Sequence, residues 1–376
     1  MSEIARSVTP DGREAWFVRR HAHVNALMND NRLSMQPPST QVASWFNDSP
    51  MHRVLLRLAD RAVPDGESDR EERARRRVTL TKMFKPSNIH RTMPDVKAYA
   101  DALLDEMIAQ GPPANLGDQF STPLCAKVVC DLLGVPDSDV PLFRQWADDK
   151  ESRDYKVAAI ALRQLSNYVR DLIKARQEQP GDDIVSFLLA QEAPDDLHVG
   201  RTANLIIFIL GLGWQVSAAA IDYGILLLLT HPDQLALLRS QPELMGRAVE
   251  EVLRHFDPTP RALGGTDRYA ETDFEFDGVQ IAKGDMLVLD VVSANHDPDV
   301  FARPEGFDIT RESNPHVTFG HGFYYCNFNQ VARNEVAVGL EAILRRLPEL
   351  RLAKPAEELE YLHYPPTGPA ELPITW

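Results

Sequence analysis

The stretch Phe319-Gly-His-Gly-Phe-Tyr-Tyr-Cys326 decides how this sequence is interpreted. Gly320 and Gly322 predict a tight loop in which the backbone can approach a flat ligand. Cys326 stands just before a predicted helix that runs to about Arg346. Free N–H groups and the positive end of a helix stabilise a thiolate, the form of cysteine that binds metals. A buried structural cysteine is the ordinary alternative, but the glycine spacing favours a thiolate ligand.

The composition is that of a globular protein, with 376 residues, 44% hydrophobic and 25% charged. A net charge of −15 argues against binding to nucleic acid, whose partners are usually basic. The three cysteines cannot all pair, and a disulfide-stapled secreted fold is not expected at this length. The first residues form no apolar signal segment, so we predict a cytoplasmic protein.

Helical patterns dominate the chain. They cover residues 68–84, 93–110, 118–134, 138–178, 199–230 and 243–256, besides the helix after Cys326. The stretch 204–230 is rich in Leu, Ile and Ala, but Gln215, Ser217 and Asp222 interrupt it. It therefore predicts a buried central helix rather than a membrane span.

A small β portion is predicted near both ends of this helical region. Ala15-Trp-Phe-Val predicts a short strand followed by a helix, and residues 274–281 alternate around Asp277-Gly278 as in a β-hairpin. An apolar strand is predicted over 286–292. Strands and helices do not alternate, so the fold class is mainly α with a small β portion, not a doubly wound sheet.

The cysteine loop resembles that of the cytochrome P-450 family, whose pattern is Phe-Gly-x-Gly, three residues, Cys, one residue, Gly. The resemblance covers nearly the whole chain, including Pro123–Pro136 and Asn295-His-Asp-Pro298. It implies the cytochrome P-450 fold as one haem-thiolate domain over 1–376. Haem b (iron protoporphyrin IX) is then expected between the central helix and the helix after Cys326. That cysteine is the implied axial iron ligand, which favours O–O cleavage.

The resemblance also assigns residues to the haem. The residues it implies as haem contacts are Arg73, Arg77, Arg268, Phe319, Gly320, Gly322, Tyr324 and Cys326, with the three arginines placed at the propionates. Tyr324 stands where bacterial members often carry histidine, and Phe328 where the family has glycine. Glu251-Val-Leu-Arg254 resembles a buried structural pair behind the haem. Gly306 stands where a third, basic partner is usual, so we expect that triad to be incomplete.

The central helix departs most from the family. The usual Ala-Gly-x-(Glu/Asp)-Thr motif aligns with Leu212-Gly-Trp-Gln-Val216, so the predicted catalytic positions are Leu212, Gly213, Gln215, Val216 and Ser217. The acid has become Gln215, the alcohol has become Val216, and Ser217 lies about 100° further around the helix. Neither replacement relays protons. Either the substrate or ordered water supplies protons, or the reaction is not ordinary hydroxylation, or the position tolerates drift.

The motif style resembles soluble bacterial members, which often tailor natural products and take electrons from ferredoxins. The implied function is an oxidase or monooxygenase for a small organic or small-peptide substrate, using dioxygen, ferredoxin and ferredoxin reductase, with no membrane partner. Arg75, Arg76, Lys82 and Lys85 could form a docking patch for the acidic electron donor. Two alternatives stay open: oxidative cross-linking of aromatic rings in a small peptide, and a catalytically idle haem-binding scaffold.

Overall fold

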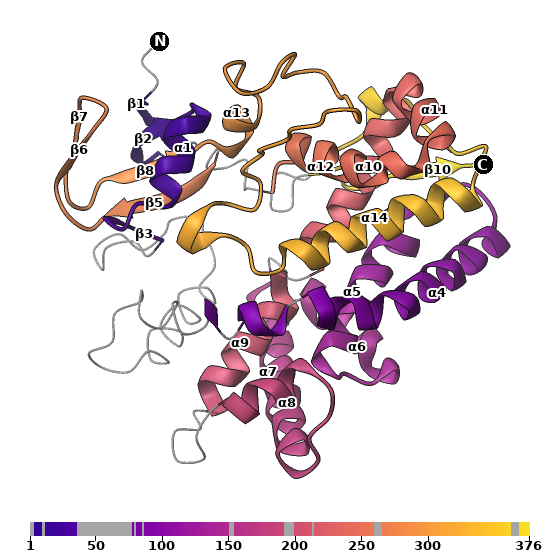
Figure 1. Cartoon of the computed structure of the whole chain (residues 1–376). Coiled ribbons are helices and arrows are strands. Elements are labelled where there is room, and N and C mark those ends of the chain that lie inside the picture. The colour runs from indigo at the N-terminus through magenta and orange to yellow at the C-terminus, as the bar shows by residue number, and fades with distance from the viewer. Residues whose placement is uncertain are drawn as a thin grey trace.

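A computed structural model describes residues 4–9, 12–35, 77–78, 80–84, 86–149, 154–191, 199–212, 214–258, 265–361 and 368–376. Helices occupy most of this length, and the largest sheet lies to one side of them (Figure 1). The mainly α fold with a small β portion is therefore confirmed.

The largest sheet has the strand order β1-β2-β8-β5-β3. Its strands are β1 (Ile4–Val8), β2 (Glu14–Val18), β3 (Leu33–Ser34), β5 (Thr266–Ala270) and β8 (Met286–Leu289). β2 pairs with β8 in parallel, and Trp16 lies opposite Leu287. The Trp16 Nε1–H also donates to Asp285 Oδ2 at 2.9 Å, which joins positions 269 residues apart. The sheet thus connects the N-terminal strands to the region just before the cysteine loop.

Two smaller sheets complete the β portion. The predicted hairpin forms between β6 (Phe274–Phe276) and β7 (Val279–Ile281), and both turn residues, Asp277 and Gly278, have positive φ. The other small sheet joins β4 (Ala114–Asn115), β10 (Pro373–Thr375) and β9 (Arg351–Leu352). Strand β1 and this last sheet were not predicted from the sequence.

Within the described residues, the predicted helical segments are helical with shifted ends, but 138–178 contains two helices. The strand predicted over 286–292 ends at Leu289, and a short helix begins at Val291. The helices are α1 (His21–Met28), α4 (Pro86–Gln110), α5 (Thr122–Leu133), α6 (Val140–Asp149), α7 (Tyr155–Glu178), α8 (Ile184–Gln191), α9 (Val199–Leu212), α10 (Gln215–Thr230), α11 (Pro232–Ser240), α12 (Met245–His255), α13 (Val291–Asn295) and α14 (Asn329–Arg346). Gly134, in the left-handed conformation with φ 73°, ends α5 at the boundary of the helical segment predicted over 118–134. A π-helical turn, η2 (Gly117–Ser121), precedes α5.

The prediction of one continuous helix over 199–230 is wrong. α9 ends at Leu212, and α10 begins at Gln215. Between them Trp214 has φ −112° and ψ −34°, and only 1% of its surface is exposed. Gly213 precedes this tryptophan in the sequence, and glycine is a poor helix former. Burial of the large indole in the core accompanies the break, which divides the predicted catalytic positions between two helices.

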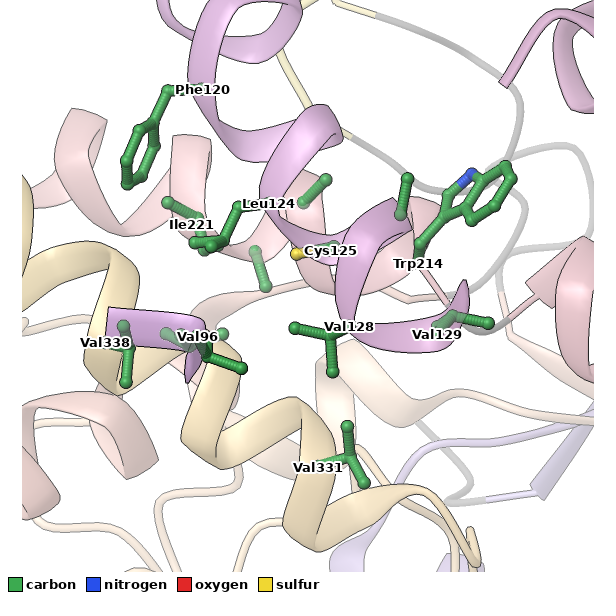
Figure 2. Packing of buried hydrophobic residues seen from close by; sticks show 14 of the residues in the cluster. Val96, Phe120, Leu124, Cys125, Val128, Val129, Trp214, Ile221, Val331 and Val338 are labelled. Carbon is green, nitrogen blue, oxygen red and sulfur yellow. The ribbon is translucent and has the colours of Figure 1, made fainter. Parts of the chain in front are cut away.

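The main apolar core lies where α5, α10 and α14 meet (Figure 2). Cys125 on α5, Ile221 on α10, and Val331 and Val338 on α14 are all buried there. A Cβ atom on Gly339 would lie 2.9 Å from Ile221 Cδ1, so glycine at this position permits the close approach of α10 and α14. Within the described ranges, no helix is both long and apolar enough to cross a membrane.

Candidate active site

The cysteine loop closes through its own backbone. The N–H of Cys326 donates to the carbonyl of Phe319 at 2.8 Å. The side-chain amide of Asn329, the first residue of α14, donates to the carbonyl of Cys326 at 2.7 Å. Together these bonds hold the sulfur just before the first turn of the helix.

The two glycines of this loop have the predicted conformational role. Gly320 and Gly322 have φ of 74° and 60°, which side chains rarely adopt. A Cβ atom on Gly322 would also lie 1.9 Å from Asn29 Oδ1, which accepts a bond from the N–H of Phe323. The backbone therefore lies in close contact with α1 and its following turn at a point that only glycine can occupy.

The electrostatics of Cys326 combine opposing effects. Burial raises the pKa of its thiol, whereas the N–H groups of Phe328 and Asn329 and the charge of Arg333 act to lower it. The donors expected at a helix start are therefore aimed at the sulfur. A metal ion bound to such a thiol removes its proton outright.

The two departures from the family's loop pattern each have a packing partner. The ring of Phe328 lies 4.5 Å from that of Phe84, centroid to centroid, with Phe328 in the right-handed helical region at φ −83°. The guanidinium of Arg268 lies 4.6 Å from the ring centroid of Tyr324. Both aromatic side chains thus belong to contacts that fix the loop.

Two of the predicted propionate arginines lie beside this loop. Arg77 donates to the carbonyls of Phe323 and Tyr325, at 2.5 and 3.2 Å. Arg268 is only 3% exposed and donates to the carbonyl of Asp267 at 2.7 Å. Arg73, Arg75, Arg76 and Lys85 lie outside the described residues, while Lys82 is exposed.

This set of groups has the chemistry that haem requires. A sulfur donor, two left-handed glycines and two guanidinium groups converge on one short loop. A haem has one iron to be ligated, a flat face that needs close backbone approach, and two propionates that need cations. The residues present fit each of these needs.

Behind the loop, Glu251 and Arg254 form a fully buried ion pair on α12. Arg254 donates to the Glu251 carboxylate at 2.8 and 2.9 Å, and both side chains are 0% exposed. Arg254 also donates to the carbonyls of Asn295, Pro304 and Gly306, at 2.9, 2.6 and 2.9 Å. Burial opposes ionisation of Glu251, but the hydrogen bonds from Arg254 hold its pKa well below the usual range.

The expectation that this triad is incomplete is wrong. Arg311 supplies the third charge, with its Nε 3.2 Å from Glu251 Oε2. Gly306, at the position where a basic side chain was expected, contributes its carbonyl to Arg254 instead. The cation lies five residues further along the chain than Gly306. Comparing this sequence with the family pattern one position at a time therefore did not find it.

A second, partly buried network beside the first was missed in the sequence. Arg333 on α14 contacts Glu250 at 2.6 and 3.1 Å, and His316 contacts the same carboxylate at 3.0 Å. Burial opposes ionisation here too, yet these partners lower the pKa of Glu250 to about 2. The guanidinium of Arg333 also stacks 4.5 Å from the Phe319 ring centroid, which connects α12 to the cysteine loop. The feature of the sequence that could have indicated this network is the pair of adjacent acids, Glu250 and Glu251, in one amphipathic helix.

The predicted catalytic positions lie around the break between α9 and α10. Leu212 is the last residue of α9, and Gly213 lies outside the described residues. Gln215 and Val216 begin α10 and are partly buried, whereas Ser217 is only 4% exposed. Ser217 is therefore more deeply buried than Gln215 and Val216, its two predicted catalytic neighbours.

Two buried acids in the helical core were also missed. Ser121 donates to Asp222 Oδ1 at 2.6 Å, and burial raises the pKa of Asp222 to about 7. Glu335 on α14 is 1% exposed, and burial raises its pKa to about 8. Asp222 interrupts an apolar run, and Glu335 falls between Val331 and Val338 on one helix face, which were the available signals.

Comparisons with known proteins agree with this geometry. The Cytochrome P450 family model matches residues 127–352. Nocardicin C N-oxygenase of Nocardia uniformis subsp. tsuyamanensis is 34% identical over 377 residues, covering 98% of this chain and 91% of the relative. Mycinamicin IV hydroxylase/epoxidase of Micromonospora griseorubida is 33% identical, covering 99% and 92%.

Solved structures show the same fold. The crystal structure of CYP105P1 in complex with filipin I has a TM-score of 0.85 at 33% identity, covering 100% of this chain and 93% of that one. The substrate-free pimaricin epoxidase PimD has a TM-score of 0.84 at 34% identity, covering 100% of this chain and 93% of that one. The chain belongs to the cytochrome P450 family. It is an oxidoreductase of the monooxygenase type, and the family implies haem with a cysteine thiolate ligand.

Proposed function

We propose that residues 1–376 form one haem-thiolate domain with Cys326 as the axial iron ligand. The observation that carries this proposal is the cysteine loop: a sulfur before α14, faced by N–H groups and approached through two left-handed glycines. When bound, haem supplies the iron at which dioxygen is activated, and the thiolate favours O–O cleavage. The protein supplies orientation and charge.

Arg77 and Arg268, together with Arg73, are assigned to the haem propionates. The first two lie beside the loop, and Arg268 is almost fully buried. A guanidinium group binds a carboxylate through charge-assisted hydrogen bonds. Their positions against Phe323, Tyr325 and Tyr324 support this role, since all three belong to the cysteine loop.

The proposed reaction is oxygenation of a small natural product in secondary metabolism. The names of the relatives favour this over other oxidations, since they include an N-oxygenase, a hydroxylase/epoxidase and a polyene macrolide epoxidase. Electrons would come from a ferredoxin and its reductase. The exposed Lys82 belongs to the sequence patch proposed to dock that acidic partner.

Oxidative coupling of aromatic rings in a small peptide is the second candidate. It rests on Gln215 and Val216 at the positions of the family's acid and alcohol. A coupling reaction that removes hydrogen atoms inserts no oxygen into the product. The fate of labelled dioxygen distinguishes the candidates: label in the product supports oxygenation, and its absence from a ring-coupled product supports coupling.

The first test of the proposal is Cys326→Ser. The variant should lose the thiolate signature in the spectrum of its reduced carbon monoxide complex, because serine is a far weaker electron donor to iron. Cys125→Ser is the matched control, and its spectrum should match that of the wild type. An unchanged spectrum in Cys326→Ser would exclude Cys326 as the ligand.

Turnover tests the remaining alternative, a catalytically idle haem-binding scaffold. The purified protein is supplied with a surrogate ferredoxin, ferredoxin reductase and a reduced nicotinamide, and a panel of polyketides and aromatic peptides is screened. A compound that changes the haem absorption spectrum when it binds and is then converted to product identifies the protein as an enzyme. A wild-type thiolate spectrum with no turnover of any compound that binds would support the scaffold.

A further inference from the structure

The residues on both sides of Cys326 contact one segment from the N-terminal part of the chain. Before the cysteine, the carbonyls of Phe323 and Tyr325 accept hydrogen bonds from Arg77, at 2.5 and 3.2 Å. These bonds join positions that are 246 and 248 residues apart in the sequence. A charged donor with two acceptors therefore holds the loop on the side where the chain enters the cysteine.

The side that follows the cysteine is held mainly by an aromatic contact. Thr81 donates to Asn327 Oδ1 at 3.4 Å, and a long, exposed bond of this kind contributes little in water. The rings of Phe84 and Phe328 lie 4.5 Å apart, centroid to centroid, with 60° between their planes. This separation is within the range of favourable aromatic pairs. The ring pair is therefore the stronger of the two contacts.

Both rings are anchored in the rest of the molecule. Phe84 is 6% exposed and belongs to the main apolar core, against which Phe328 also packs. Phe328 is the N-cap of α14, and its backbone has φ −83° and ψ 0°, a conformation open to residues with a side chain. The ring pair thus connects the first turn of α14 to the segment that contains Arg77 and Phe84.

The first turn of α14 is in turn bonded to the cysteine. Asn329 donates to the carbonyl of Cys326 through its side-chain amide at 2.7 Å and through its N–H at 3.4 Å. Phe328 stands between these two residues in the sequence, where the family pattern has glycine. Glycine has no side chain to make such a contact, so this phenylalanine adds an anchor beside the sulfur that the usual loop pattern lacks.

We propose that Phe328, held by Phe84, is a positioning residue for the axial ligand. The ring pair keeps the first turn of α14, and with it Cys326, in the place where the sulfur can bind iron. This inference rests on the proposed assignment of Cys326 as the ligand. Without the ring contact the turn moves more readily, and the thiolate takes up a proton from solvent. Haem stays bound, because Arg77 and Arg268 keep their positions.

The first test follows the thiolate signature of the reduced carbon monoxide complex in urea, below the concentration that unfolds the holoenzyme. Phe328→Gly restores the residue of the family pattern, and Phe328→Leu keeps an apolar side chain without the ring. Both variants should lose the signature roughly tenfold faster than the wild type, the scale expected when an aromatic pair and its buried area are lost. Their haem content should equal that of the wild type, and their helix content should stay constant while the signature is lost.

Phe143→Leu is the matched control for the loss of a buried ring. Phe143 is 1% exposed, and its ring centroid lies 4.8 Å from that of Tyr168, in the contact between α6 and α7. This variant should be less stable, but it should lose the thiolate signature and its helix content together, as followed by circular dichroism. The same joint loss in Phe328→Gly and Phe328→Leu would overturn the proposal, because the ring would then serve folding alone.

Phe84→Leu tests whether the two rings act as a pair. It should speed the loss of the signature as much as Phe328→Leu does, and the double variant should be no faster than either single variant. A double variant whose effect is the product of the two single effects, or a wild-type rate in Phe84→Leu, would refute this inference alone. A wild-type protein without any thiolate signature would refute the assignment of Cys326, and this inference with it.

Discussion

Two pairs of carboxyl groups in this protein have pKa values shifted in opposite directions. Behind the cysteine loop, Glu250 and Glu251 face arginines and a histidine, and both have lowered pKa values, about 2 for Glu250. In the helical core, Asp222 accepts a hydrogen bond from Ser121, whereas neither carboxyl oxygen of Glu335 has a hydrogen-bond partner. The pKa values of these two acids rise to about 7 and about 8. Burial is the largest single influence on all four.

The difference shows that burial alone does not determine the charge of an acid. A buried carboxylate stays ionised where two or more cationic or N–H donors surround it, as around Glu251. Where no cation faces the acid, the same burial raises its pKa, as it does at Glu335. The region behind the cysteine loop is therefore held together by charge, and the core around Glu335 is neutral.

The largest expected effect comes from breaking the charged region. Arg254→Ala leaves Glu251 buried without its main partner, and should lower the free energy of unfolding by about 3–5 kcal/mol. Urea denaturation of the holoenzyme measures this loss. Arg247→Ala on the same helix is the control, because that arginine is 46% exposed and should contribute about 0–1 kcal/mol. Equal losses in the two variants would contradict the comparison.

The neutral region predicts a stability that depends on pH. Glu335 has a pKa of about 8 in the fold, against 4.5 for the free side chain. As pH rises between these values, the unfolded chain loses this proton first, so folding stability falls, by roughly 3 kcal/mol between pH 5 and pH 8. Glu335→Gln should remove this part of the pH dependence, as followed by thermal unfolding.

The control for that experiment is Glu341→Gln, on the exposed side of the same helix. Its carboxylate is 52% exposed and should leave the wild-type slope intact. The difference in stability between wild type and Glu335→Gln should grow as pH rises. A constant difference from pH 5 to pH 8 would mean that Glu335 is ionised in the fold.

The comparison of charged and neutral surroundings also applies to Arg77 and Arg268, which donate to backbone carbonyls rather than to carboxylates. Arg77→Ala and Arg268→Ala should each weaken haem retention by roughly 1.5–3 kcal/mol, the range for a hydrogen bond to a charged group. Haem content after gel filtration and the rate of haem transfer to apomyoglobin measure this. Arg163→Ala on the exposed face of α7 is the control. Equal haem loss in all three variants would contradict the assignment of Arg77 and Arg268 to the haem propionates.

The smallest expected effect concerns the acid–alcohol positions themselves. Val216→Thr, alone or with Gln215→Glu, should not raise productive turnover, because we expect the substrate or ordered water to supply protons in place of the missing pair. The added hydroxyl could displace the substrate or a water and lower turnover. Product per reduced nicotinamide consumed, measured with the true substrate, decides the matter. A large gain from poor wild-type coupling would indicate that the departures are drift in a weakened hydroxylase.

Local patterns in the sequence predicted the parts of the fold that depend on local chemistry. Gly320 and Gly322 predicted a loop that needs left-handed backbone, and Asp277-Gly278 predicted a hairpin. The break before Gln215 was missed because the apolar run continues across it. The break coincides with the burial of Trp214, which depends on helices distant in the sequence.

The sequence predicted those contacts of the site whose residues lie close together in the chain. The pair of Glu251 and Arg254 lies one helical turn apart, so its spacing is visible in the sequence. Arg311 reaches the same carboxylate across 60 residues, and no local pattern marks that contact. Glu335 likewise looks like an ordinary helical acid until α5 and α10 pack over it. Tertiary contacts, which change the electrostatics of a residue, were the missing information.

The parallel pairing of β2 with β8 has a consequence for how the chain folds during synthesis. The contact between Trp16 and Asp285 spans 269 residues, so β1 and β2 leave the ribosome long before β8 exists. A two-stranded hairpin is barely stable alone in water. Its apolar side chains, including Phe17, therefore stay exposed while most of the helical region is made, and chaperones are expected to bind this hairpin on nascent chains.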